Sequence, residues 1–184
     1  MAHDFLRLLP PLLRILFLQY GCAVGVGNVL LIATTTYFVE EFDLDTSAAA
    51  TISSILGFMN MVECPLGGYV SDVANIKFGV RGRIWVQLLL LLAEGTCVIV
   101  FALMKELWAA IMVMTLLSLL FQAAGSTTFA LVPYVGEHHG GVAGIVGSGA
   151  ECGALSFGMG FLFFSQMKHA CFLMGGAVIF SALF

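Results

Sequence analysis

The stretch IWVQLLLLLAEGTCVIVFALM, residues 84–104, indicates the fold class of this chain because Glu94 is its only charged residue. An α-helix rises about 1.5 Å per residue, and about 20 apolar residues cross the hydrocarbon core of a bilayer. The stretch is long enough for that crossing. It therefore predicts a membrane-spanning helix.

The composition of the whole chain agrees with this prediction. Of the 184 residues, 60% are hydrophobic and 10% are charged, and the mean hydropathy is +1.04. Soluble domains carry about 25% charged residues. The seven Lys and Arg are scattered, so they cannot build a phosphate-binding surface. We therefore expect an integral membrane protein, and we exclude a soluble enzyme, a disordered chain and a nucleic-acid-binding protein.

Six apolar windows follow one another along the chain. They are residues 12–38, 48–70, 84–104, 108–133, 142–165 and 170–184. Pro, Gly and charged residues gather in the gaps, which is typical of turns in water. Asp45, Thr46 and Ser47 are candidate caps for the second helix. We predict an all-α membrane protein, a single bundle of six transmembrane helices over residues 1–184.

The Lys and Arg residues predict the orientation, because short loops rich in them stay in the cytoplasm. Those before or at the start of the first window and between the second and third are Arg7, Arg14, Lys77, Arg81 and Arg83. The loops on the opposite side contain only Lys105 and Lys168. We therefore expect a multi-pass protein of the plasma membrane with both termini in the cytoplasm.

Glycines crowd the fifth window and the residues before it. They are Gly140, Gly141, Gly144, Gly147, Gly149, Gly153, Gly158 and Gly160. Small residues three or four positions apart let a neighbouring helix approach closely. We predict tight contact between this helix and another. The contact is either plain bundle packing or part of a helix that lines a pathway or rocks against its neighbour.

Three acidic residues, Glu63, Glu94 and Glu151, lie inside apolar windows. An ionised carboxylate in the membrane costs about 2.5 kcal/mol or more, so such residues usually face the bundle interior or a water-filled cavity. Each of the three is either a functional group, such as a reversible proton site, or a neutral acid hydrogen-bonded to a neighbouring helix.

Other reactive residues give no pattern typical of an enzyme or a metal site. The cysteines lie in apolar stretches without ligand spacing, and we expect reduced thiols at Cys22, Cys64, Cys97, Cys152 and Cys171. His138 and His139 have no further ligand at metal-binding spacing. We expect no enzyme activity, no cofactor and no metal.

Two motifs resemble those of a known transporter family. GGYVSDVANIKFGVRGRIW (67–85) and VPYVGEHHGGVAGIVGSGAECG (132–153) are similar to GGxxSDxxxxxxGMRGRLW and VPFVSRRxLGxxSGxxGAGGNxG of the nitrate/nitrite porters, a family of the major facilitator superfamily. The similarity extends to YGCAVGVG, TYFVEEFDL, GFMNMVECPLGG and QAAGSTTFALVPYV, and so covers nearly the whole chain. The chain resembles the C-terminal six-helix half of a twelve-helix transporter, especially of the plant and algal high-affinity branch.

The resemblance implies alternating access, in which two six-helix halves rock around an anion site at the membrane midplane, with proton symport. It implies nitrate or nitrite as the substrate and an N-terminal six-helix half as the partner. The substrate-pathway candidates are Asn60, Glu63, Cys64, Gly147, Gly149, Glu151 and Gly153. The conformational loop motif comprises Gly68, Asp72, Arg81 and Arg83, and we expect Asp72 and the two arginines to form a clamp at the cytoplasmic face.

Two candidate positions differ from the family pattern. The arginine of the family's ARPxGG falls on Cys64, and the asparagine of GAGGNxG falls on Glu151. An anion that leaves water needs charge-assisted donors, which a thiol and a carboxylate do not supply.

Several alternatives therefore stay open. The chain is one half of a nitrate or nitrite transporter, a diverged porter that uses Glu63 and Glu151 for a neutral or cationic solute, or a non-transporting membrane subunit. A degenerating copy of a porter also fits the two substitutions.

Overall fold

The computed structural model describes residues 10–136, 138–163 and 167–184, with side chains except at 60–64 and 161–163. This part contains the helices α2 (Pro11–Phe42), α3 (Thr46–Phe78), α4 (Val80–Leu103), α5 (Leu107–Leu131), η1 (Val132–Tyr134), α6 (His139–Phe163) and α7 (Met167–Ser181). No strand occurs among the described residues. The prediction of an all-α protein is confirmed.

Four helical segments in the described part are long and apolar enough to cross a membrane. They are Pro11–Phe42, Val80–Leu103, Leu107–Tyr134 and His139–Gly160. Two further segments, Thr46–Met59 and Met167–Ser181, are apolar but shorter. Large apolar side chains are exposed on the outside, among them Ile76 at 83% and Trp108 at 79%. The chain is an integral, multi-pass membrane protein, whereas the count of six spans stays a prediction.

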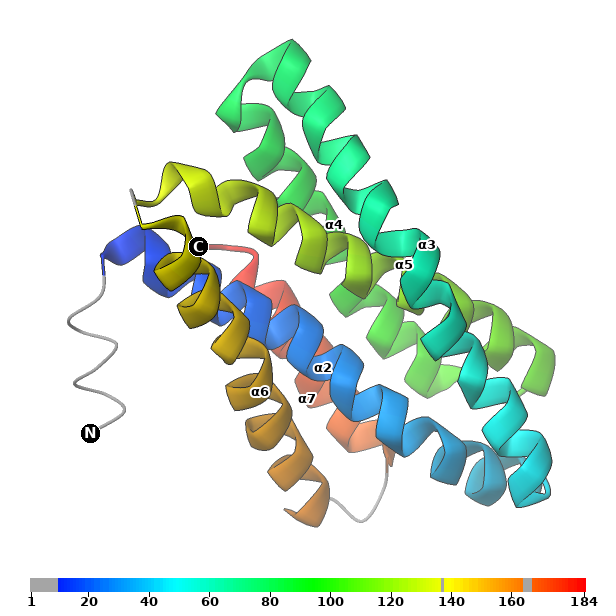
Figure 1. Cartoon of the computed structure of the whole chain (residues 1–184). Helices are drawn as coiled ribbons and strands as arrows, with labels where there is room; N and C mark the ends of the chain where they lie inside the picture. The colour runs from blue at the N-terminus through cyan, green and yellow to red at the C-terminus, as the bar shows by residue number, and fades with distance from the viewer. Residues whose placement is uncertain (1–9, 137, 164–166) are drawn as a thin grey trace.

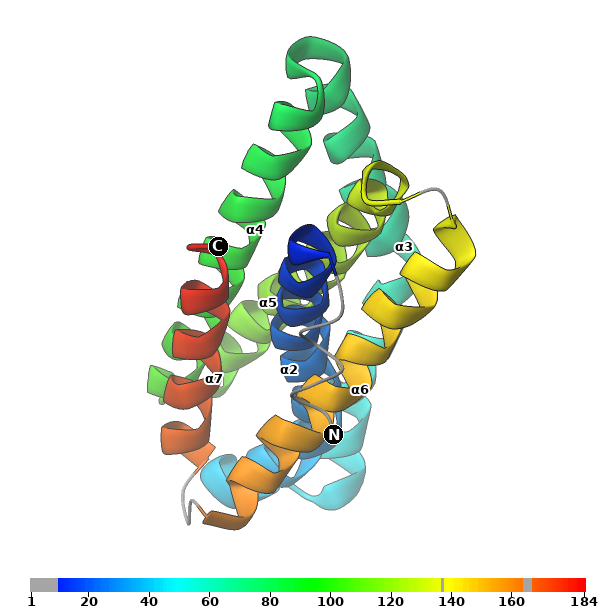
Figure 2. The same cartoon turned by 90° about the vertical axis from the view of Figure 1, so that its left-hand side faces the viewer.

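Helix α2 lies in the middle of the bundle and packs against α3, α5, α6 and α7 (Figure 1). The other helices form pairs: α3 packs along α5, and α4 packs along α7 (Figure 2). The large buried side chains Phe38, Phe101, Leu91 and Met174 belong to the core between these elements. This arrangement leaves α6 with α2 as its principal neighbour.

Close contacts between glycines give the relative directions of two helix pairs. Gly149 faces the backbone of Phe17, and Gly153 faces that of Gly21, so the residue numbers of α6 and α2 rise together and the helices are parallel. Gly95 contacts Ile179, and Gly175 contacts Ile99, so α4 and α7 are antiparallel. In a chain that crosses a bilayer in alternating directions, the first and fifth helices are parallel, as α2 and α6 are here. The third and sixth helices are antiparallel, as α4 and α7 are here.

The connection between α3 and α4 differs from the sequence prediction. We expected residues 71–83 as a loop between two helices, but α3 continues to Phe78 and α4 begins at Val80. Gly79 makes the turn with a φ of +65°, a conformation that favours glycine, and its N–H donates to the carbonyl of Asn75 at 2.8 Å. The loop prediction is wrong because hydropathy windows detect apolar residues, and polar residues can continue a helix beyond the membrane.

The start of α3 agrees with the capping prediction. The side chain of Asp45 accepts a hydrogen bond from the backbone N–H of Ser47 at 3.1 Å. Such a bond satisfies one of the free N–H groups at a helix start. Of the three candidate caps, Asp45 is therefore the N-cap.

Candidate functional site

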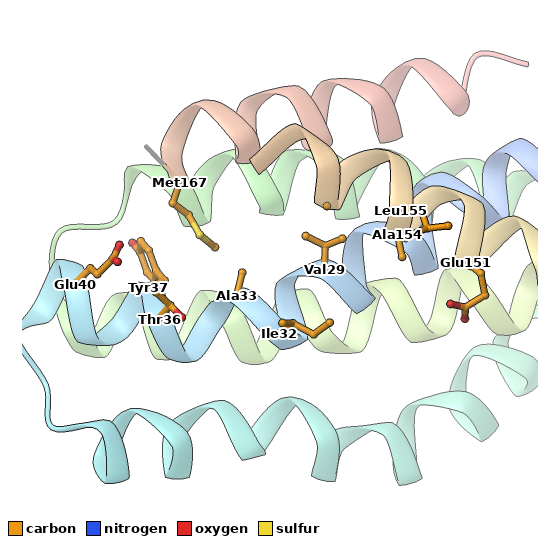
Figure 3. A pocket seen from close by; sticks show the side chains of 11 residues that line it. Val29, Ile32, Ala33, Thr36, Tyr37, Glu40, Glu151, Ala154, Leu155 and Met167 are labelled. Carbon is orange, nitrogen blue, oxygen red and sulfur yellow. The ribbon is translucent and has the colours of Figure 1, made fainter. Parts of the chain in front are cut away.

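A pocket of about 590 Å³ lies between α2 and α6, near the start of α7. Most of its lining is apolar, and Val29, Ile32, Ala33, Ala154 and Leu155 form its middle (Figure 3). Its polar lining residues are Thr36, Tyr37, Glu40 and Glu151. No Lys, Arg or His is among the residues that line it. The described part of this pocket therefore offers carboxylates and hydroxyls, but no cation.

The two carboxylates lie at opposite ends of the pocket (Figure 3). Glu151 comes from the exposed side of α6, and Glu40 comes from the last turns of α2. The glycine contacts place Glu151 between the levels of Gln19 and Ala23 on α2, so along the axis of that helix it lies at least about 25 Å from Glu40. A small solute cannot contact both carboxylates at once.

The end of the pocket at Glu40 contains the most polar groups. Tyr37 is 3% exposed, and its hydroxyl has no hydrogen-bond partner in the described part of the chain. Next to the lining residue Met167, the amine of Lys168 pairs with the carboxylate of Glu41 at 3.1 Å and links α7 to α2. Lys168, beside this end of the pocket, is therefore already neutralised by an acid.

The glycines of α6 form the predicted tight contact, and its partner is α2. A Cβ atom added at Gly153 would overlap the backbone of Gly21, and one added at Gly149 would overlap the carbonyl of Phe17. The contact prediction is confirmed. The same contact determines the direction of the Glu151 side chain. Because Gly149 and Gly153 face α2, the intervening Glu151 points away from the contact and remains exposed.

Asp72 and Arg83 form an ion pair across the α3–α4 hairpin, with 2.7 Å between a carboxylate oxygen and a guanidinium nitrogen. The Arg83 side chain is largely buried, donates to the hydroxyl of Ser71 at 3.1 Å, and lies over the ring of Tyr134 at 5.9 Å. Arg81 is exposed and makes no ion pair in the described part, so it differs from our expectation of a three-residue clamp. The role of the pair in transport stays a prediction.

The remaining predicted site residues divide into two groups. The side chains of Asn60, Glu63 and Cys64 lie outside the described part. Gly68 has open space around its Cβ position, and Gly147 lies near the ring of Phe129 on α5. Of the predicted pathway residues, the structure brings Gly149, Glu151 and Gly153 together along one segment of α6.

Glu94 lies apart from the pocket, on α4. It is fully buried, and neither carboxylate oxygen has a hydrogen-bond partner in the described part. The described residues therefore show no hydrogen bond from a neighbouring helix to this acid. The next residue, Gly95, contacts the backbone of Gly175 on α7, so close helix packing covers this region.

Sequence reasoning missed three polar residues that line the pocket, namely Thr36, Tyr37 and Glu40. Ala33, Tyr37 and Glu40 recur at helical spacing, which places them on one face of α2. That spacing was the available signal. It was not enough to find the pocket, because Glu40 also belongs to the acidic EEFDLD segment that follows the first window.

Nitrate transporters are among the relatives of this chain. High affinity nitrate transporter 2.7 of Arabidopsis thaliana is 37% identical over 142 residues, which are 77% of this chain and 29% of the relative. Nitrate transporter 2.2 of Chlamydomonas reinhardtii is 33% identical over 76% of this chain and 28% of the relative. The nitrate/nitrite transporter NrtP of Picosynechococcus is 30% identical over 78% of this chain and 27% of the relative.

These similarities confirm the resemblance that the two motifs predicted. No family model matches the chain. The chain spans less than a third of the length of the curated relatives it matches. The names of these relatives are those of transporters, in agreement with the prediction that the chain is not an enzyme.

Proposed function

We propose that this chain, a relative of the nitrate/nitrite porters, forms one half of a proton-coupled transporter that carries nitrate or nitrite across a membrane. The observation that carries the proposal is the 37% identity to a plant high affinity nitrate transporter over 77% of the chain. Because the matched region is 29% of that relative, we infer that a second half completes the transport path.

The arrangement of α2 and α6 supports a role in alternating access. Rocking of one half against another needs helices that move as rigid bodies. The direct backbone contacts of Gly153 with Gly21 and of Gly149 with Phe17 hold these two helices in one register. We infer that α2 and α6 move together and that the pocket between them moves with them.

The second half supplies the positive charge for the anion in this proposal. The resemblance places Cys64 and Glu151 where the family has an arginine and an asparagine. The pocket beside Glu151 has no cationic lining residue. An anion in the membrane needs charge-assisted donors, so it would bind mainly to the other half, and weakly.

Tracer uptake tests this function. Cells that lack nitrate uptake would produce the chain together with the N-terminal half of the Arabidopsis relative. We expect uptake of labelled nitrate that is faster at acidic than at alkaline external pH, since proton symport is driven by the proton gradient. Absence of uptake, with both halves present and associated in the membrane, would contradict the proposal.

A second candidate function follows from the charges of the pocket. Glu40 and Glu151 line it without a neighbouring free cation in the described part, and its middle is apolar. This lining favours a neutral or cationic solute over an anion. Uptake assays distinguish the two functions: labelled methylammonium, a cationic solute, would be taken up in the second case, whereas excess methylammonium chloride would leave nitrate uptake unchanged in the first.

The location and orientation are part of the same proposal. We place the chain in the plasma membrane with its N-terminus and the α3–α4 turn in the cytoplasm, because Lys77, Arg81 and Arg83 flank that turn. An epitope inserted after Gly79 would then be accessible to antibody only after the cells are permeabilised. Labelling of intact cells would contradict this orientation.

A further inference from the structure

A groove of about 550 Å³ runs along the α3–α4 hairpin, away from the pocket between α2 and α6. The hairpin end projects beyond the other helices at the top of Figures 1 and 2. At its base, Gly82 packs directly against the backbone of Ala74, so the two helices are in close contact there. The rest of the groove is lined mainly by Phe78, Arg81, Trp85 and Leu89.

Three of these residues lie on one face of α4. Arg81, Trp85 and Leu89 follow one another at intervals of four, which puts them on one face over about 12 Å along the helix axis. All three are exposed, Trp85 at 63% and Leu89 at 61%. The face therefore begins with a cation at the turn, continues with an indole, and ends with an aliphatic side chain.

The cation at the start of this face is available to a ligand. Arg81 makes no ion pair or hydrogen bond with another described residue, whereas Arg83 is engaged by Asp72. Lys77, in the last turn of α3, is exposed and likewise without an ion pair in the described part. Asp72 is the only acidic residue between Gly67 and Ala93, and Arg83 already neutralises it. The turn thus has an excess of positive charge.

The order of groups along the groove matches that of a phospholipid. Exposed Trp residues of membrane proteins lie at the level of the lipid headgroups, and Lys and Arg at helix ends extend toward the phosphates. Exposed Phe78 and Leu89 would face acyl chains in the same bilayer. We propose that this groove binds an anionic phospholipid, with its phosphate at Arg81 and Lys77 and an acyl chain along Trp85 and Leu89.

The apolar part of the groove is the reason to name a lipid and not a free phosphate. A free phosphate would use only the cationic end and would leave the exposed indole and leucine without a partner. An anionic headgroup gains attraction from the two cations, at about 1 kcal/mol each near a membrane surface. This lipid site is independent of the transported solute, because none of its residues lines the pocket between α2 and α6.

Native mass spectrometry of the full chain in detergent tests the proposal. The purified protein would be titrated with phosphatidylglycerol and, separately, with phosphatidylcholine. We expect tighter binding of phosphatidylglycerol and a loss of about fivefold in its affinity in Arg81→Gln. Arg81→Lys keeps the charge and should retain most of the affinity. Equal binding of the two lipids by the unaltered chain would overturn the proposal.

Matched variants just beyond the opposite end of α4, in the connection to α5 and the first turn of α5, control for charge and for hydrophobicity. Lys105→Gln removes an exposed cation there, and Trp108→Ala removes the other Trp, which is 79% exposed. We expect neither change to alter the affinity for phosphatidylglycerol, whereas Trp85→Ala lowers it. An equal loss in Lys105→Gln and Arg81→Gln would show attraction by net charge alone. Displacement by excess glycerol phosphate would show a free-phosphate site. Either result would overturn the proposal.

Discussion

Gly153 of α6 faces the carbonyl group of Gly21 of α2 so closely that a single added methyl group would overlap it. This relation puts the two helices in direct backbone contact. It also turns the side chain of Glu151, two residues earlier, toward the exposed side of α6 and the pocket. The packing of one pair of glycines thus determines how the candidate site is presented.

Replacing Gly153 by Ala should destabilise the bundle. Overpacking of a tight contact costs about 1–3 kcal/mol, and for a chain of this size that lowers the melting temperature by roughly 2–12 °C. Thermal unfolding in detergent measures the shift. Gly144→Ala is the matched control, since Gly144 lies on the same helix with open space at its Cβ position, and there the change should be neutral or stabilising. Equal shifts for the two variants would contradict the contact.

Replacing Asp72 by Ala should slow transport and leave the affinity for substrate nearly unchanged. The Asp72–Arg83 pair lies at the α3–α4 hairpin, far from the pocket residue Glu40, so it can influence the conformational step without touching the solute. Initial uptake rates at varied nitrate concentration, in the transporter completed by its N-terminal half, separate the two effects. An Asp72→Ala variant with a normal maximal rate would argue against a conformational clamp.

Replacing Glu94 by Met should stabilise the protein. Glu94 is fully buried and lacks a hydrogen-bond partner in the described part, and such an unsatisfied polar group costs about 1–3 kcal/mol. Met has a similar length and no polar oxygen. We expect a melting temperature several degrees higher for Glu94→Met and little change for Glu94→Gln, which keeps an unsatisfied group. A lower melting temperature for the Met variant would mean that the carboxyl makes a stabilising interaction.

Restoring the family residues at two positions should strengthen nitrate binding. At about 4 Å and an effective dielectric constant near 20, one charge changes the interaction energy by roughly 4 kcal/mol, and even a quarter of this corresponds to about fivefold in affinity. Cys64→Arg combined with Glu151→Asn should therefore bind nitrate at least about tenfold more tightly than the unaltered protein, both completed by the N-terminal half. Titration calorimetry measures the two affinities. Tight nitrate binding by the unaltered protein would show that these two residues do not line the site.

Much of the fold was predictable because membrane helices need long apolar segments. Windows such as 84–104 depend on composition alone, and α4 covers this window almost completely at Val80–Leu103. The prediction failed at residues 71–78 and 80–83, which are helical although they contain polar and charged residues. Hydropathy reports where a chain enters lipid, whereas the end of a helix depends on local signals such as the positive φ of Gly79.

The candidate site was less predictable, because it depends on how separate helices meet. The glycines of the fifth window predicted a tight contact, but they did not identify α2 as the partner. In retrospect, Gly21 and Gly25 repeat the spacing of Gly149 and Gly153. The pocket itself forms where α2 and α6 diverge beyond this contact, so the inclusion of Tyr37 and Glu40 follows from three-dimensional packing and not from a motif.

Nitrate flux into liposomes tests the central claim most directly. The chain, the N-terminal half of the Arabidopsis relative, and the complex of both would be reconstituted separately, with an imposed proton gradient. The account predicts saturable nitrate uptake by the complex and none by either half, because a shared site at the midplane needs both halves. Saturable uptake by the chain alone, or no uptake by an intact complex, would contradict it.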